Sequence, residues 1–156
     1  NLIGSEVMNN LTSYKFGGIH QHTPEIEQVL TLISSKSVKI SFTPILAPMP
    51  RGILATVTAK LEKSSAVAKL RKTFSDYYRE SKFVSLLPEG QMPMTNSVLG
   101  TNNVSMQIAL DSNVNRIIVS TAIDNLGKGA AGQAIQNANL MCNLAEDAGL
   151  NLTGVR

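Results

Sequence analysis

The spacing of apolar residues predicts three helices. The first follows Thr23 and Pro24, the expected N-cap and first helical residue. It carries apolar side chains at i, i+3, i+4 and i+7, one face of a helix: Ile26, Val29, Leu30 and Ile33. Residues 65–81 repeat this spacing. The third stretch, about residues 128–148, is rich in Ala, and its apolar stripe includes Cys142.

Strict alternation of apolar and polar residues predicts strands. It occurs at residues 38–42 and 53–61, both typical of half-buried strands. Residues 83–87 predict a short strand, and residues 88–103 a loop. Residues 104–123 then predict a hairpin: two alternating runs joined by the turn sequence "DSNVN".

The order of these elements predicts the fold class. A short helical start is expected before residue 13, and Gly149 is the expected C-cap of the last helix. The succession helix, strands, helix, strands, helix indicates an α+β fold with a largely antiparallel sheet and helices on one face. A length of 156 residues suits one domain, residues 1–156.

Composition narrows the possible function classes. The net charge is +3 and the basic residues are dispersed, so no nucleic-acid partner is expected. No apolar run is long enough to span a membrane, and no signal peptide is recognisable. The single cysteine excludes an internal disulfide and suits a reducing compartment, so we expect a cytoplasmic protein.

The two histidines, His20 and His22, are the first candidates for chemistry. In an extended segment residues i and i+2 point the same way, so both could face one site. His22 lies just ahead of a predicted helix N-terminus, whose dipole favours a neutral imidazole that can accept a proton. The alternative is two loop histidines with ordinary hydrogen bonds. A metal site would need a third ligand, and only Glu25 is near, so none is predicted.

Three further features have a functional and a structural interpretation. Arg51, beside a stiff proline loop, suits a carboxylate or phosphate, but could equally be an exposed loop residue. Cys142 is interpreted as core packing, because a thiol on an apolar stripe stays protonated. Gly127, Gly129 and Gly132 match G-x-G-x-x-G, yet no second parallel strand follows, so a dinucleotide fold is rejected. A Gly-rich helix N-terminus can still face a phosphate.

Four segments together resemble a known family: "GGIHQHTPEIEQ", "FTPILAPMPRGILATV", "GTNNV" and "DNLGKGAAGQAIQNANLM". They are similar to the C-terminal part of the N-acetyl-gamma-glutamyl-phosphate reductases, and the resemblance covers nearly the whole chain. It implies a glyceraldehyde-3-phosphate dehydrogenase-like fold, in which a Rossmann domain precedes an α+β catalytic and dimerisation domain. The chain matches the second domain, and its C-terminal helix, residues 124–149, would pack on the first.

The resemblance also implies a reaction. The family reduces N-acetyl-L-glutamyl 5-phosphate with NADPH to N-acetyl-L-glutamate 5-semialdehyde in arginine biosynthesis, through a thioester on a cysteine. The Rossmann domain and the nucleophile's segment are not among these residues, so the isolated chain is expected to be inactive. The family often has Arg between the histidines and His in the "FTP" segment, where this chain has Gln21 and Ile45.

Residue roles follow by the same resemblance. His22 would be the base, with His20 as second candidate, and Arg51 would bind the substrate. The residues expected near the NADP cofactor are Asn125, Gly127 and Lys128. A homo-oligomer through the sheet is expected. Two alternatives remain: a reductase of aminoadipyl phosphate in lysine biosynthesis, or a non-catalytic dimerisation module.

Overall fold

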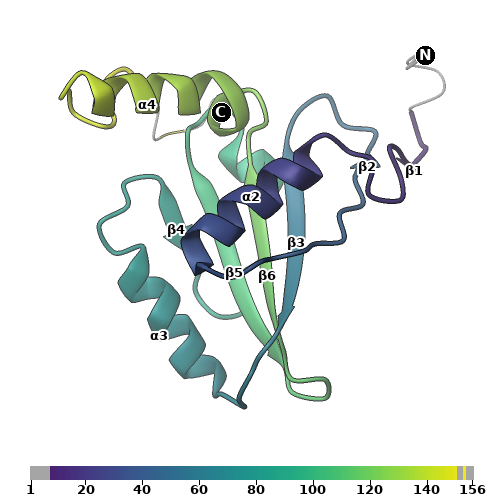
Figure 1. The fold of residues 1–156 in the computed structure, drawn as a ribbon. Helices are drawn as coiled ribbons and strands as arrows, with labels where there is room; N and C mark the ends of the chain where they lie inside the picture. Colours follow the sequence, from purple (N-terminus) through teal and green to yellow (C-terminus); the bar gives the residue numbers. More distant parts are fainter. Residues whose placement is uncertain (1–7, 151–152, 154–156) are drawn as a thin grey trace. The chain divides into compact units, whose positions relative to one another are not determined.

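The computed structural model describes residues 8–150 and 153, so the helical start predicted before residue 13 lies mainly outside the described residues. The chain divides into two compact units, Asn1–Pro50 and Arg51–Arg156 (Figure 1). Each unit is described by itself below. In the described part of the chain, no helix combines the length and the apolar character needed to cross a bilayer.

The second unit contains a four-stranded sheet with the order β3-β6-β5-β4. Its strands are β3 (Ile53–Lys60), β4 (Val84–Leu86), β5 (Val104–Asp111) and β6 (Arg116–Ile123). β5 and β6 form the predicted hairpin, and β3 pairs antiparallel with β6. Only the pairing of β4 with β5 is parallel. These elements confirm the α+β prediction with a mainly antiparallel sheet.

Helix α3 (Val67–Tyr77) builds the core of this unit, as its predicted apolar face requires. Met106, Ile108 and Ile117 are buried, and β5 presents the first two on the same face because side chains alternate along a strand. The partly buried side chains that α3 and its C-terminal turn pack against them are Leu70, Phe74 and Tyr78.

β3 begins at the predicted residue and ends one residue early, but it does not have the predicted burial. Leu54 and Val57 are more than half exposed, and Ile53 is exposed as well. The expectation of a half-buried strand is therefore wrong for this chain. The reason is position: β3 is an edge strand, and α3 packs against β5 instead.

The C-terminal helix is shorter than predicted. A π-helical turn, η2 (Gly127–Ala131), leads into α4 (Gly132–Met141). The helix ends there because Asn143 adopts the left-handed conformation (φ 54°), which Asn tolerates better than most residues. Gly149 therefore does not cap this helix. Cys142 is the C-cap residue and is exposed, so its assignment to a buried stripe is also wrong.

The first unit is organised around helix α2 (His22–Ser34). This helix begins before Thr23, with Gln21 at the N-cap position and no side-chain cap, so the predicted Thr23 cap is wrong. Its predicted apolar face is also largely uncovered within the chain, because Val29, Leu30 and Ile33 are exposed. A short antiparallel pair, β1 (Thr12–Ser13) with β2 (Ile45–Leu46), completes the unit.

Residues 38–42 do not form the predicted strand. The alternation of burial is present, but the backbone N–H groups bond to side chains of α2 instead of another strand. Val38 N donates to Thr31 Oγ1 at 3.0 Å, and Ile40 N donates to Glu27 Oε1 at 3.1 Å. The pattern therefore identified an extended segment correctly, while its pairing partner is a helix.

Candidate active site

The first unit holds the two histidines next to each other. Their ring centroids are 4.8 Å apart in an edge-on arrangement. His20 is buried, with only 6% of its surface exposed, and its ring also lies edge-on to Tyr14 and Phe42. His22 is exposed and is the first residue of α2 rather than a residue ahead of it.

A hydrogen bond fixes the tautomer of His20. The backbone N–H of His22 donates to His20 Nδ1 at 3.1 Å. An N–H can only donate, so Nδ1 carries no proton and a neutral His20 must carry it on Nε2. Burial lowers the pKa of His20, and neighbouring His22 and Lys15 lower it further. His20 Nδ1 thus accepts the first backbone N–H of α2 from a position just before the N-cap residue, and the other nitrogen of the neutral ring is a donor.

Arg51 lies two residues before the start of β3 and bonds to Asp124, which follows β6. Arg51 Nε lies 2.7 Å from Asp124 Oδ1. Asp124 has no exposed surface and also accepts hydrogen bonds from three backbone N–H groups, those of Gly100, Leu126 and Gly127. Burial alone would raise the pKa of Asp124, but the Arg51 guanidinium and these N–H groups outweigh it and lower the pKa well below its usual range.

Asn125, the residue after Asp124, bonds to the same segment before β3. Its Oδ1 accepts a hydrogen bond from Gly52 N at 2.7 Å, which leaves its Nδ2 amide as the group that can donate outward. Asp124 and Asn125 together therefore fasten the segment of Arg51 and Gly52 to the end of β6.

Gly127 and Lys128 face the interior of this unit. A Cβ on Gly127 would meet the backbone oxygen of Thr101 at 2.5 Å, so this glycine permits a close approach of two backbones. The Lys128 ammonium donates to Gln136 Oε1 at 2.6 Å and lies over the Phe83 ring. Burial lowers the pKa of Lys128, with Glu146 opposing that effect.

The cavity beside these residues is small. It measures about 140 Å³ and lies between the loop at Gly100–Asn102 and the start of η2 and α4. This volume is well below the range of about 300–1,000 Å³ that is usual for small-molecule sites. The cavity that Gly127 and Gly132 line is therefore too small to enclose a dinucleotide.

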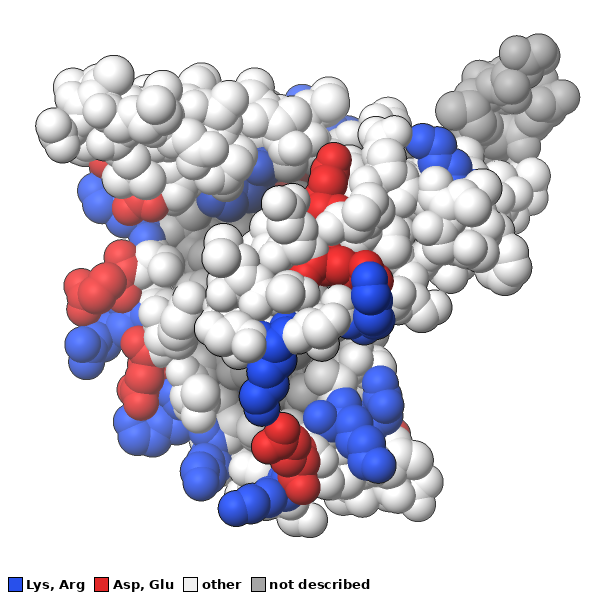
Figure 2. Space-filling view, viewed as in Figure 1, with Lys and Arg blue, Asp and Glu red and all other residues white. Residues whose placement is uncertain are grey.

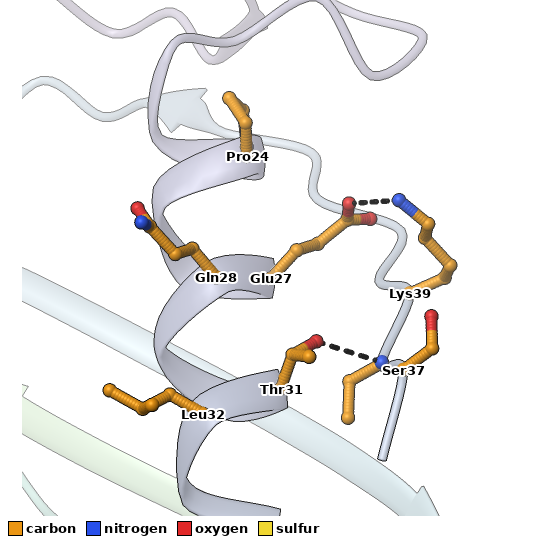
Figure 3. Close-up of a pocket in the computed structure, with 8 residues that line it drawn as sticks. Pro24, Glu27, Gln28, Thr31, Leu32, Ser37 and Lys39 are labelled. Carbon is orange, nitrogen blue, oxygen red and sulfur yellow. Dashed lines mark hydrogen bonds and ion pairs between the residues drawn. The ribbon is translucent and has the colours of Figure 1, made fainter. Parts of the chain in front are cut away.

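The first unit has a separate groove between α2 and the segment that follows it (Figure 3). Pro24, Gln28 and Leu32 contribute from α2. An ion pair of 2.7 Å between Lys39 and Glu27 crosses the groove. None of the residues predicted for catalysis lines it.

Charge and metal-binding side chains are dispersed. On the face shown in Figure 2, Lys and Arg alternate with Asp and Glu, and the surface over α4 is largely uncharged. Among residues 8–150 and 153, no three His, Cys, Asp or Glu side chains gather into a group that could hold a metal ion.

The pairing of Asp124 with Arg51 was not predicted from the sequence. A signal for Asp124 itself was present, because an Asp directly after a strand commonly accepts hydrogen bonds from backbone N–H groups two and three residues ahead. Leu126 and Gly127 provide those groups here. The bond to Arg51, 73 residues away in sequence, had no such local signal.

Comparison with protein families gives a match over most of the chain. Residues 1–125 match the family described as semialdehyde dehydrogenase, dimerisation domain. Curated relatives named N-acetyl-gamma-glutamyl-phosphate reductase are 54% identical in an Arthrobacter species and 48% identical in Streptomyces clavuligerus. Both alignments cover 99% of this chain, which confirms the resemblance drawn from the four segments.

The same alignments cover 45% and 46% of the two relatives, so the chain spans less than half of their length. Solved structures confirm the fold. Aspartate semialdehyde dehydrogenase II from Vibrio cholerae superposes with a TM-score of 0.70 at 17% identity, over 86% of this chain and 42% of that one. The enzyme from Francisella tularensis gives 0.70 at 16% identity, over 85% and 39%.

Proposed function

Because the chain belongs to the semialdehyde dehydrogenase dimerisation-domain family, we propose that it is the catalytic and dimerisation part of an N-acetyl-gamma-glutamyl-phosphate reductase. The complete enzyme reduces N-acetyl-L-glutamyl 5-phosphate to N-acetyl-L-glutamate 5-semialdehyde with NADPH in arginine biosynthesis. The main support is the 54% identity to a relative of that name over 99% of the chain.

His22 acts as the base in this proposal. A base must present an unprotonated nitrogen to the proton that it takes. His20 accepts from the α2 backbone at Nδ1, so a neutral His20 has a donor at Nε2, which suits hydrogen bonding to the substrate and not proton abstraction. His22 is exposed and next to it, and it takes the proton of a cysteine outside this chain. Exposed Cys142, at the end of α4, is not that nucleophile.

Arg51 binds the substrate through its outer guanidinium nitrogens. Its bond to Asp124 uses Nε, and its side chain is 36% exposed, so the Nη groups can reach a carboxylate or a phosphate. Asn125 offers its Nδ2 amide to the cofactor, which supplies the hydride. Gly127 contributes by packing, and Lys128 by holding Gln136 in place.

The larger part of the NADP site belongs to a domain outside this chain, against which α4 packs. The exposed apolar side chains of Leu140, Met141 and Leu144 suit such a contact, because apolar surface of this kind is normally covered. The exposed apolar residues of β3 suit a second contact, with another copy of the chain, which the name of the family supports.

The test is NADPH oxidation with N-acetyl-L-glutamyl 5-phosphate. We expect turnover by the complete protein, at rates in the usual range of about 1–10³ s⁻¹, and none by the 156-residue chain alone. Aminoadipyl phosphate serves as the matched control substrate. A complete protein that turns over neither substrate, while folded and able to bind NADPH, would refute the proposal.

A further inference from the structure

A single buried carboxylate connects the segments that carry the proposed substrate and cofactor contacts. Asp124 Oδ1 accepts from Arg51 Nε at 2.7 Å and from Leu126 N and Gly127 N at 2.9 and 3.0 Å. Asp124 Oδ2 accepts from Gly100 N at 2.6 Å. Three parts of the chain that are distant in sequence therefore meet at one side chain.

These bonds have different consequences. The three backbone N–H groups satisfy the carboxylate's need for donors. They do not neutralise its charge, and an uncompensated buried charge is strongly destabilising. Among the residues that the structure describes, Arg51 is the cation with which Asp124 is paired. The guanidinium is planar, so fixing Nε also fixes the direction in which its two Nη groups point.

We propose that Asp124 is a positioning residue, which holds the Arg51 guanidinium so that its Nη groups face an anionic group of the substrate. This inference rests on the proposed function and deepens it. Asp124 itself does not touch the substrate, because its side chain is fully buried. The competing interpretation is that Arg51 only neutralises Asp124 and that the pair stabilises the fold without contributing to substrate binding.

A double-mutant cycle in the complete protein separates the two interpretations. The variants are Asp124→Asn, Arg51→Ala and the double variant, with Asp76→Asn as control, because Asp76 forms an exposed ion pair on α3. Circular dichroism establishes that each variant is folded. The measured quantities are KM for N-acetyl-L-glutamyl 5-phosphate, KM for NADPH and kcat.

Positioning predicts that Asp124→Asn raises KM for the acyl phosphate by about tenfold or more, the factor expected from about 1.4 kcal/mol of lost interaction. It also predicts that the double variant is no worse than Arg51→Ala, since Asp124 acts through Arg51. A folded Asp124→Asn enzyme with unchanged KM, or effects that multiply in the double variant, would overturn the inference.

A second measurement does not require Asp124→Asn to fold, or any turnover. The ¹⁵N signal of Arg51 Nε–H in the wild-type protein is assigned by its loss in Arg51→Lys. We expect slow exchange with water and a shift when N-acetyl-L-glutamate or inorganic phosphate is added. A signal that neither probe moves refutes positioning. If the wild-type protein has no reductase activity, the proposed function fails, and this signal alone decides whether Arg51 is held toward an anion.

Discussion

Alanine at Gly127 and at Gly129 should have opposite effects on stability, although both glycines belong to one motif. A Cβ at Gly127 would lie 2.5 Å from Thr101 O, far inside the 3.4 Å at which ordinary van der Waals contact begins. A Cβ at Gly129 would have its nearest neighbour at 3.5 Å. Neither residue has a positive φ, so the difference between the two is steric.

The size of the effect follows from two terms. Overpacking of this kind costs about 1–3 kcal/mol, while replacing Gly by Ala inside a helix gains about 0.5–1 kcal/mol. The obstructing atom at Gly127 is a backbone oxygen of a buried residue, and Asp124 fixes the neighbouring Gly100, so the loop cannot easily retreat. Gly127→Ala should therefore lower the free energy of unfolding by about 1–2 kcal/mol, whereas Gly129→Ala should raise it by about 0.5–1 kcal/mol.

Urea unfolding measures this difference. With a slope of about 1–3 kcal/mol per M, the midpoints of the two variants should be separated by roughly 1 M, with unchanged slopes. Gly132→Ala should resemble Gly127→Ala, because its Cβ would meet Asn102 Oδ1 and the backbone oxygen of Gly127. Equal midpoints for Gly127→Ala and Gly129→Ala would show that the close packing of η2 on the loop at 100–102 is not the reason that Gly127 is required.

Four further predictions follow from the two units. His22→Asn should lower kcat/KM of the complete enzyme by about 10²-fold or more, and His20→Asn should lower it less; the reverse order would transfer the base to His20. Because the pKa of folded His20 is lowered, its stabilising contribution is complete above the unfolded value of 6.5 and is lost as pH falls through 6.5 toward the folded value. The free energy of unfolding measured with urea should thus be lower at pH 5.5 than at pH 7.5 in the wild-type protein, and His20→Asn should reduce this difference. An equal difference in both proteins would contradict the assignment of the pH dependence to His20. Cys142→Ser should leave turnover intact and change stability by no more than about 0.5 kcal/mol, since this thiol is exposed; abolished turnover in a folded variant would make it the nucleophile. The chain should self-associate through its sheet, and replacing Leu54 and Val57, the exposed apolar residues of β3, by Ser should weaken that association in sedimentation; a wild-type chain that is purely monomeric at tens of micromolar would refute it.

The parts of the fold that sequence predicted well are those fixed by local pattern. The hairpin β5–β6 was predicted because alternation and a turn sequence both act over a few residues, and Met106 and Ile108 are buried as that alternation requires. The predictions that were wrong concern features set by residues that are farther apart in the sequence. The edge position of β3 exposes Val57, and the bond from Ile40 N to Glu27 replaces a strand partner with a helix. Neither the edge position of β3 nor the helical partner of Ile40 can be inferred from the alternation of apolar and polar residues.

Helix ends were predicted less well, for a related reason. The last helix was extended to Gly149 because glycine is the most common residue in the left-handed position. Asn143 takes that conformation earlier in the chain and ends α4, so Cys142 moves from a predicted apolar stripe to an exposed cap. Thr23 was the better cap by propensity, but α2 begins one residue earlier, at His22, with Gln21 at the N-cap position, and the imidazole of His20 accepts the first helical N–H.

The G-x-G-x-x-G pattern shows how one spacing can arise from two different physical causes. In dinucleotide folds the glycines let a phosphate approach the backbone at a helix N-terminus. Here Gly127 and Gly132 let another part of the same chain approach, namely Thr101 O and Asn102 Oδ1. Both uses need a residue without Cβ at the start of a helix, so the spacing alone does not separate them. What separates them is the atom that a Cβ would meet, and in this chain that atom belongs to the loop that Asp124 also holds through Gly100.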